Sequence, residues 1–292
     1  MDVEPAPDFL PEKDWQDYGY GIYSGRYGNI YTVRQMLQLV QRSLGEFEPK
    51  EDIWEHKGGI VDPFRPTLQP EPFGTVEEMK ACRHSHLQAI AEMFSSAGLL
   101  IFTMGLTESY FSKQDGAVYP VCPGVSGGTY SDNDHQFINF NYVEVVRDFN
   151  TLKSLFNKIN PKIRYMLTVS PVPLVATATD KNVGVATTYS KSVLRAAAGA
   201  LSDGKGRVDY FPSYEIISMP AGKGMFYESD KRGVQSAGVA HVMANVLNSF
   251  SNRKSGSGTS NAQNVVEIRP KSKTGSEDAA VCDEELLAQF GR

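Results

Sequence analysis

The chain has little cysteine. Its 292 residues include three, Cys82, Cys122 and Cys282, which are odd in number and far apart. None belongs to a CxxC pair, and no cysteine–histidine group has the spacing of metal ligands. These absences argue against a disulfide framework and a zinc motif. We therefore expect reduced thiols, a cytoplasmic location, and neither a metal nor another cofactor.

The chain also lacks an excess of positive charge and a long apolar run. It has 29 Lys and Arg against 34 Asp and Glu, a formal net charge of -5, which disfavours binding to nucleic-acid phosphates. The longest apolar stretch, 98–102, is far too short to cross a bilayer. The first residues contain neither the basic region nor the apolar region of a signal peptide. We expect no nucleic-acid and no membrane partner, and the oligomeric state is left open.

The residues that are present indicate a globular α/β protein. Hydrophobic residues make up 41% and charged residues 22%, enough apolar material for a core. Apolar residues at Val33, Met36, Leu37 and Val40 have helical spacing. Thr75 followed by Glu78 has the pattern of a capping box. Periodicity and end signals predict helices over 30–44, 75–97, 142–159, 187–201 and 236–250.

Short apolar runs between these helices predict the strands 99–104, 163–169 and 208–211. Alternation of strand, loop and helix is typical of a parallel sheet, whose ligands bind at the carboxyl ends of the strands. The turn-rich segment 115–141 is expected to be a long loop. We assign 1–250 to one domain, 251–275 to a flexible linker, and 276–292 to a tail with a short helix.

Two parts of the chain, 105–108 and 230–241, have the residue types of a catalytic site. Gly105, Thr107 and Glu108 follow the first predicted strand, where a backbone N–H, a hydroxyl and a carboxylate can share a crevice; the alternative is an ordinary turn. Residues 124–128 match GxSxG but lack the strand before and the helix after a nucleophile elbow.

The second candidate is a histidine near a carboxylate. His241 lies on the last predicted helix, shortly after Asp230, and such a pair is the usual general-base arrangement. The alternative is a histidine on a helix face that a neighbouring residue satisfies. The remaining histidines show no metal-binding spacing: His84 and His86, for example, point in different directions on their helix.

Six segments, in this order, resemble the GSCFA family and span about 18–250 of the chain. They are RYGNIYTVRQMLQL (26–39), VDPFRP (61–66), IFTMGLTE (101–108), TVSPVPL (168–174), TTYSKSVLR (187–195) and VDYFPSYEII (208–217). The resemblance implies a three-layer α/β/α sandwich with a mainly parallel, flavodoxin-like sheet, akin to SGNH hydrolases. Those enzymes attack acyl esters, often O-acetylated sugars, with a serine on the first strand, oxyanion donors from a glycine and an asparagine, and a histidine in DxxH.

The chain departs from that pattern twice. The Gly-Ser-Cys-Phe-Ala segment is absent, so we expect the first strand and helix to be missing. Counting DxxH from Asp230 gives Gly233, which leaves His241 as the candidate base. Thr107 stands where the asparagine donor is expected. The resemblance then gives these candidate oxyanion or substrate-binding residues: Gly28, Asn29, Gly105, Thr107, Glu108 and Ser170.

Two functions follow as hypotheses. The first is an acyl-ester hydrolase or O-acyltransferase of SGNH type, acting on a carbohydrate or similar small-molecule ester, in a form that carries the upstream serine. The second is a catalytically inactive remnant that binds a glycan or other ligand, or a protein partner. Loss of the serine favours the second, because little acyl transfer survives without the nucleophile.

Overall fold

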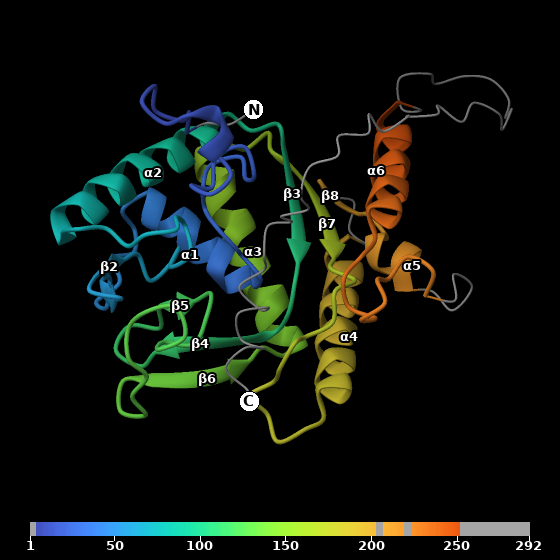
Figure 1. Ribbon diagram of the computed structural model, residues 1–292. Coiled ribbons are helices and arrows are strands. Elements are labelled where there is room, and N and C mark those ends of the chain that lie inside the picture. The colour runs from blue at the N-terminus through green and yellow to red at the C-terminus, as the bar shows by residue number, and fades with distance from the viewer. Residues whose placement is uncertain (1–3, 203–206, 219–223, 252–292) are drawn as a thin grey trace, which may run out of the picture.

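Parallel strands form the central sheet of the computed structural model, which describes residues 4–202, 207–218 and 224–251 (Figure 1). The strands β3 (Leu99–Met104), β7 (Arg164–Val169) and β8 (Val208–Tyr210) lie in the order β3-β7-β8. Both pairings are parallel, with Leu99 opposite Arg164 and Tyr165 opposite Val208. The three predicted strands are therefore confirmed within a residue of their predicted ends.

The predicted helices are also present. They are α1 (Val33–Ser43), α2 (Val76–Ser96), α3 (Tyr142–Ile159), α4 (Val183–Ser202) and α6 (Ser236–Ser251). Thr32 and Asn141 form capping boxes at the starts of α1 and α3. At α2 the box is incomplete: Thr75 accepts the Glu78 N–H, but the Glu78 carboxylate accepts from Gly74 instead of Thr75. The sequence did not predict the short helices η1 (Glu12–Asp14) and α5 (Ser213–Ser218).

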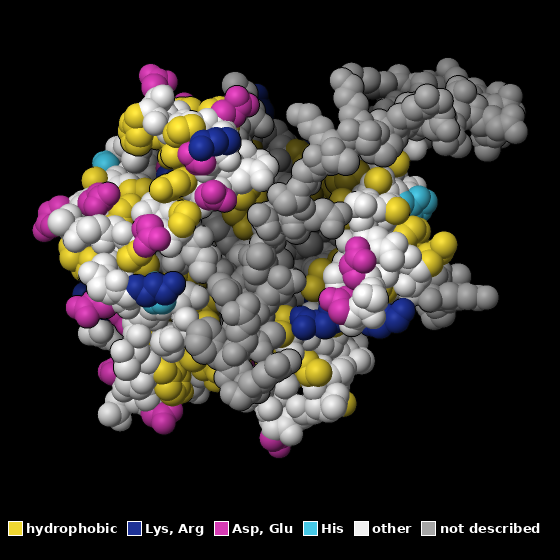
Figure 2. Space-filling view, in the orientation of Figure 1, with side chains coloured by type: hydrophobic (Ala, Val, Ile, Leu, Met, Phe, Trp, Pro, Cys, Tyr) yellow, Lys and Arg dark blue, Asp and Glu magenta, His cyan; other side chains and the backbone are white. Residues whose placement is uncertain are grey.

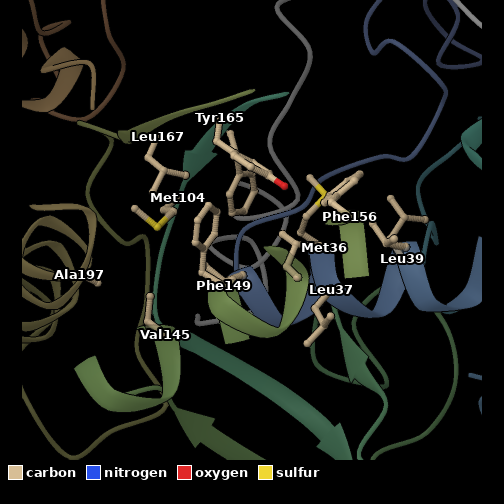
Figure 3. Packing of buried hydrophobic residues seen from close by; sticks show 14 of the residues in the cluster. Met36, Leu37, Leu39, Met104, Val145, Phe149, Phe156, Tyr165, Leu167 and Ala197 are labelled. Carbon is tan, nitrogen blue, oxygen red and sulfur yellow. The ribbon is translucent and has the colours of Figure 1, made fainter. Parts of the chain in front are cut away.

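The main core joins the central sheet to the helices beside it (Figure 3). Phe102, Met104 and Leu167 project from the strands into a cluster that contains Phe149 of α3, which is fully buried. The same cluster includes apolar residues of α1, α2 and α4. The apolar face predicted for α1 is buried here, which explains why a helix with this spacing packs beside the sheet.

A second sheet, which is antiparallel, is formed by the part of the chain between β3 and α3. Its strands β4 (Glu108–Ser112), β5 (Val118–Tyr119) and β6 (His135–Asn139) lie in the order β5-β4-β6. A small hairpin, β1 (Trp54–His56) with β2 (Gly59–Val61), lies elsewhere in the chain. The expectation of a single long loop over 115–141 is therefore wrong: its two ends are strands that pair with β4 across a turn-rich middle.

The α/β class and the parallel central sheet are thus established. In Figure 1, α1, α2 and α3 lie to one side of β3 and β7, α5 and α6 lie to the other, and α4 lies below the strands. α4 also contacts α3 and contributes to the same core. The three-layer sandwich implied by the resemblance stays a prediction, and the second and third sheets are antiparallel. The predicted linker 251–275 and tail 276–292 lie outside the described residues, apart from the end of α6.

Within the described part of the chain, every helix is too short or too polar to cross a membrane. Figure 2 shows acidic and basic side chains interspersed over the face in view, without a large area of one sign. Among the described residues, histidine, cysteine, aspartate and glutamate form no group of three or more with metal-binding geometry.

Phe149 tests the importance of the main core. We expect Phe149→Ala to lower the free energy of unfolding by about 3–5 kcal/mol, because it leaves a cavity among fully buried neighbours. Val143→Ala on the same helix is the control: Val143 is 68% exposed, and the change should be within about 0.5 kcal/mol. Urea unfolding measures both. Equal effects of the two substitutions would contradict this placement of α3.

Candidate functional site

The turn after β3 is held by contacts from two directions. The Gly105 N–H donates to the carbonyl oxygen of Tyr31 (2.9 Å), and Lys191 Nζ of α4 donates to the Gly105 carbonyl oxygen (2.6 Å). Lys191 is only 3% exposed. A side chain at position 105 would press on the Tyr31 ring, since an added Cβ would lie 3.1 Å from Cδ1. Glycine is therefore the residue that permits this close approach.

Thr107 has both of its hydrogens engaged inside the protein. The residue is fully buried, its N–H donates to Ser190 Oγ (3.0 Å), and its hydroxyl donates to Asn139 Oδ1 (2.6 Å). In this arrangement neither group points at a ligand. These two hydrogen bonds connect the residue before β4 to α4 and β6. In this structure Thr107 therefore has a structural role and does not donate to an oxyanion.

A groove of about 590 Å³ runs along β3 and brings four of the predicted residues together. Its lining includes Gly28, Asn29, Gly105 and Ser170. Gly28 has φ +68°, a conformation that favours glycine, and it packs against Arg65. The motifs around 28, 105 and 170 are far apart in sequence but meet at the end of β3.

The groove follows a strand edge that is open in the described part of the chain. Arg164 N–H donates to Gly98 O (3.1 Å) and Ser170 N–H donates to Met104 O (2.9 Å), so even-numbered residues face β7. By alternation, the backbone groups of Leu99, Ile101 and Thr103 face away from β7. No described strand pairs with that edge, and the Ile101 side chain is 54% exposed.

A second cavity, of about 230 Å³, lies on the other side of the same turn. Its walls are largely apolar and include Tyr31, which also lines the groove, together with Leu106. Glu108 is its charged lining residue, and the carboxylate accepts hydrogen bonds from Thr177 Oγ1 (2.6 Å) and the Ala178 N–H (3.1 Å). This volume is below the ~300–1,000 Å³ of pockets for drug-sized ligands and suits a small apolar group.

Cys122 and Tyr110 line the same cavity. Burial raises the pKa of the Cys122 thiol, so the thiol is protonated at neutral pH. Burial also raises the pKa of the Tyr110 hydroxyl, with Cys122 adding to the effect. Neither side chain is therefore an activated nucleophile, and both extend the neutral lining of the cavity.

Asp230 and His241 do not form a pair. Asp230 accepts hydrogen bonds from the N–H groups of Arg232 (2.8 Å) and Gly233 (3.0 Å), which lower its pKa. The exposed His241 ring on α6 stacks on Phe226 with centroids 5.4 Å apart. The predicted base and its carboxylate therefore have separate partners in this structure.

Two other histidines do have carboxylate partners, and these partners lie far away along the chain. His135 Nε2 lies 2.6 Å from Glu51 Oε2, and His86 Nδ1 lies 3.2 Å from Glu4 Oε2. The partners are 84 and 82 residues apart, so no local spacing signals them. His135 lies in the segment 115–141, which was expected to be a loop, and is only 3% exposed.

A buried network of ion pairs around Asp62 lies behind the loop that lines the groove. The carboxylate of Asp62 lies 3.2 Å from both Arg65 Nε and Arg83 Nη2, and Arg65 also donates to the Arg26 carbonyl oxygen (3.3 Å). Burial alone would raise the pKa of Asp62, but Arg83, Arg65 and Arg42 hold it well below its ordinary value. The VDPFRP and RYGN motifs thus fix the loop that lines the groove.

Comparison with known proteins gives one match. A model of the GSCFA family matches residues 12–246, which is most of the chain. No curated protein and no solved structure matches. The six motifs identified in the sequence lie within the matched range, and they include both the turn after β3 and the segments that line the groove.

A structural role for the Thr107 hydroxyl and a role as oxyanion donor predict different effects of its removal on the free energy of unfolding. Thr107→Val should destabilise the fold by about 1–3 kcal/mol, because Asn139 Oδ1 loses its donor in a buried site. Thr107→Ser, which keeps the hydroxyl, should restore much of that loss, and Thr103→Val at an exposed position should have little effect. Urea unfolding decides: wild-type stability of Thr107→Val would show that the hydroxyl is not committed to Asn139.

His86 should make stability depend on pH between about 6.5 and 5. Burial lowers the pKa of His86 from 6.5 to about 4, with Arg65 adding to the effect. As the pH falls through this window, the unfolded chain gains a proton that the folded protein does not. The free energy of unfolding should therefore fall by up to about 1.4 kcal/mol per pH unit from this residue.

Denaturant unfolding of His86→Asn at several pH values measures that contribution. The slope between pH 6.5 and 5 should become shallower, while His84→Asn, at an exposed position on the same helix, should leave it unchanged. A wild-type slope in His86→Asn would mean that the buried imidazole titrates at its ordinary pKa.

Proposed function

The chain belongs to the GSCFA family, and we propose on that basis that its scaffold supports acyl transfer. The reaction is hydrolysis or transfer of an acyl ester of a carbohydrate or similar alcohol, by a form that carries a serine-bearing strand upstream of residue 1. The observation that supports this most strongly is the open edge of β3, which ends among the residues that the family motifs supply.

An added strand parallel to β3 would complete the hydrogen bonding of that edge. The N–H and C=O groups of Leu99, Ile101 and Thr103 are oriented to receive it. Its side chains would also flank Ile101 on the face of the sheet, and complete burial of an isoleucine side chain, about 1.5–3 kcal/mol, is the upper limit of that contribution. An open edge with an exposed apolar side chain is a liability that folded proteins usually cover.

A strand in this position would deliver its next residue to the end of the groove. Its carboxyl end would lie near Gly105 and Ser170, because parallel strands end at the same edge of a sheet. A serine there would attack the ester carbonyl carbon, a base would take the hydroxyl proton, and N–H groups would hold the oxyanion. Collapse of the intermediate would expel the alcohol, and water or an acceptor alcohol would release the acyl group.

The apolar cavity beside Leu106 is the proposed acyl site. It meets the groove at Tyr31, so an ester whose carbonyl carbon lies at the groove end could extend its acyl group into the cavity. The Glu108 carboxylate would disfavour an anionic acid in the same place. A neutral ester would therefore bind better than the carboxylate product of hydrolysis.

His241 is the proposed base, and Asp230 the proposed orienting carboxylate. In this role the imidazole would have to leave Phe226 and turn towards the strand end, which requires a different placement of α6. The second candidate function, a binding module without catalysis, is favoured by the present positions of these two residues and by the internal bonds of Thr107. The apolar cavity would then bind a ligand without turning it over.

Hydrolysis of p-nitrophenyl acetate tests the proposal. We expect turnover by an extended form in which the upstream reading frame supplies a serine-bearing strand, and at least ~10³-fold less when that serine is replaced by alanine. Ile101→Asp in the extended form should lower turnover because it puts a charge among the apolar side chains that would flank it on the face of the sheet. The chain of 292 residues should be inactive.

Two outcomes would contradict the proposal. Turnover by the 292-residue chain that is abolished by His241→Ala would place the nucleophile within the described sequence. Equal inactivity of the folded extended form and the 292-residue chain would remove support for esterase activity and favour the binding module.

A further inference from the structure

A small, partly open cavity lies behind the groove, beside α1 and the loop that precedes it. Its volume is about 30 Å³, which is enough for a water molecule or a monatomic ion, since one water needs roughly 10–15 Å³ by this measure. Arg42, Arg65 and His86 contribute to its walls, and no aspartate or glutamate does. It shares Tyr27 and Asn29 with the groove, so its contents would support the loop that lines the groove.

Arg42 is the unusual member of this wall. It lies in the last turn of α1 with only 9% of its surface exposed, and its guanidinium stacks on the Phe64 ring at 3.8 Å from the centroid. Among the described residues it has neither a carboxylate within ion-pair distance nor a hydrogen-bond acceptor. Burial lowers its pKa to about 10, so the group still carries its proton at neutral pH.

A second donor faces no protein acceptor. The Gln35 side-chain oxygen accepts from the Thr32 N–H (2.8 Å) and the Tyr31 N–H (3.0 Å), which fixes the amide at the start of α1. In the described part of the chain, the Gln35 amide nitrogen has no acceptor, and Gln35 lines the same cavity as Arg42. Both donors reach water-sized space although their residues are more than nine-tenths buried. Polar groups in such residues normally have partners, so two donors at one cavity indicate that its contents accept from them.

Asp62 and Asp52 lie close enough to Arg42 to favour its charged form, but the surrounding charges leave it without a carboxylate partner of its own. Three other arginines belong to this part of the structure, and each has a carboxylate partner. Arg26 pairs with Glu4, Arg65 with Asp62, and Arg83 with both Asp52 and Asp62. Four arginines therefore stand against three carboxylates in this part of the described structure. The cost of a buried, unpaired charge is large, and a nearby counter-charge removes most of it.

We propose that this cavity binds a small inorganic anion of the size of chloride, with the Arg42 guanidinium as its main ligand and the Gln35 amide as a second donor. The anion completes the charge balance of the buried network. It also holds the end of α1 against the 26–30 loop, and through that loop it supports the wall of the groove. The site does not depend on the proposed acyl transfer, because neither of its proposed ligands, Arg42 and Gln35, lines the groove or the acyl cavity.

Thermal unfolding of the full 292-residue chain in sodium chloride and in sodium gluconate at equal ionic strength tests the site. Chloride should raise the Tm saturably, by about 2–4 °C when its concentration is several times the Kd, whereas gluconate is too large to enter. Arg42→Met should abolish the chloride-specific rise. Arg147→Met, at an exposed position on α3, should retain it.

The line width of the ³⁵Cl resonance of chloride gives a direct second measurement on the wild-type protein. Binding should broaden the line, and bromide should compete and narrow it; this readout stands even if Arg42→Met fails to fold. The same Tm in chloride and gluconate, with no chloride broadening, would overturn the proposal and mean that water fills the cavity. A chloride response that Arg42→Met retains would place the anion elsewhere.

Discussion

Among the described strands, β3 pairs with β7 alone, and this one-sided pairing is the constraint on which the arrangement of the site depends. On the paired edge, β7 fixes the register of β3, and side chains such as Phe102 and Met104 enter the main core. On the other edge, backbone groups and the exposed Ile101 border the groove. Pairing with β7 and the core therefore fix the position of the strand, while the backbone groups of its other edge can still form hydrogen bonds. The groove ends where the chain turns at Gly105, so edge and candidate site are one continuous feature.

The turn at the end of β3 links the two sheets to the helices. Tyr31 precedes α1 and accepts from Gly105, while Ser190 and Lys191 reach the same turn from α4. Thr107 then joins the turn to Asn139 of β6. The Thr107–Ser190 contact is buried and the contacts of Lys191 with Gly105 and of Thr107 with Asn139 are partly buried. Buried polar groups must be paired to avoid a desolvation cost. The family motifs around 31, 107 and 190 are therefore structural partners at one point, whatever chemistry occurs beside them.

Much of the fold was predictable because its elements have strong local signals. The strand 99–104 and the helix 142–159 match β3 and α3 at both ends, since an apolar run and a capped amphipathic pattern define them. The sheet β4–β6 was missed because its strands are short and embedded in turn-rich sequence, and its pairing is non-local.

The site was predictable only in part, for a related reason. The position after the first predicted strand indicated Gly105, and motif resemblance added Gly28, Asn29 and Ser170. The roles of single side chains were not predictable, because they depend on partners far along the chain. Thr107 binds Ser190, 83 residues away, and no pattern near Thr107 reveals that bond.

The central claim is that the open edge of β3 receives one more parallel strand. Amide hydrogen exchange at Ile101 and Thr103 tests it most directly, because their N–H groups face that edge. We predict fast exchange in the 292-residue chain and strong protection in a form extended upstream, while Phe102, which faces β7, is protected in both. Equal exchange at Ile101 and Thr103 in the two forms would contradict the account.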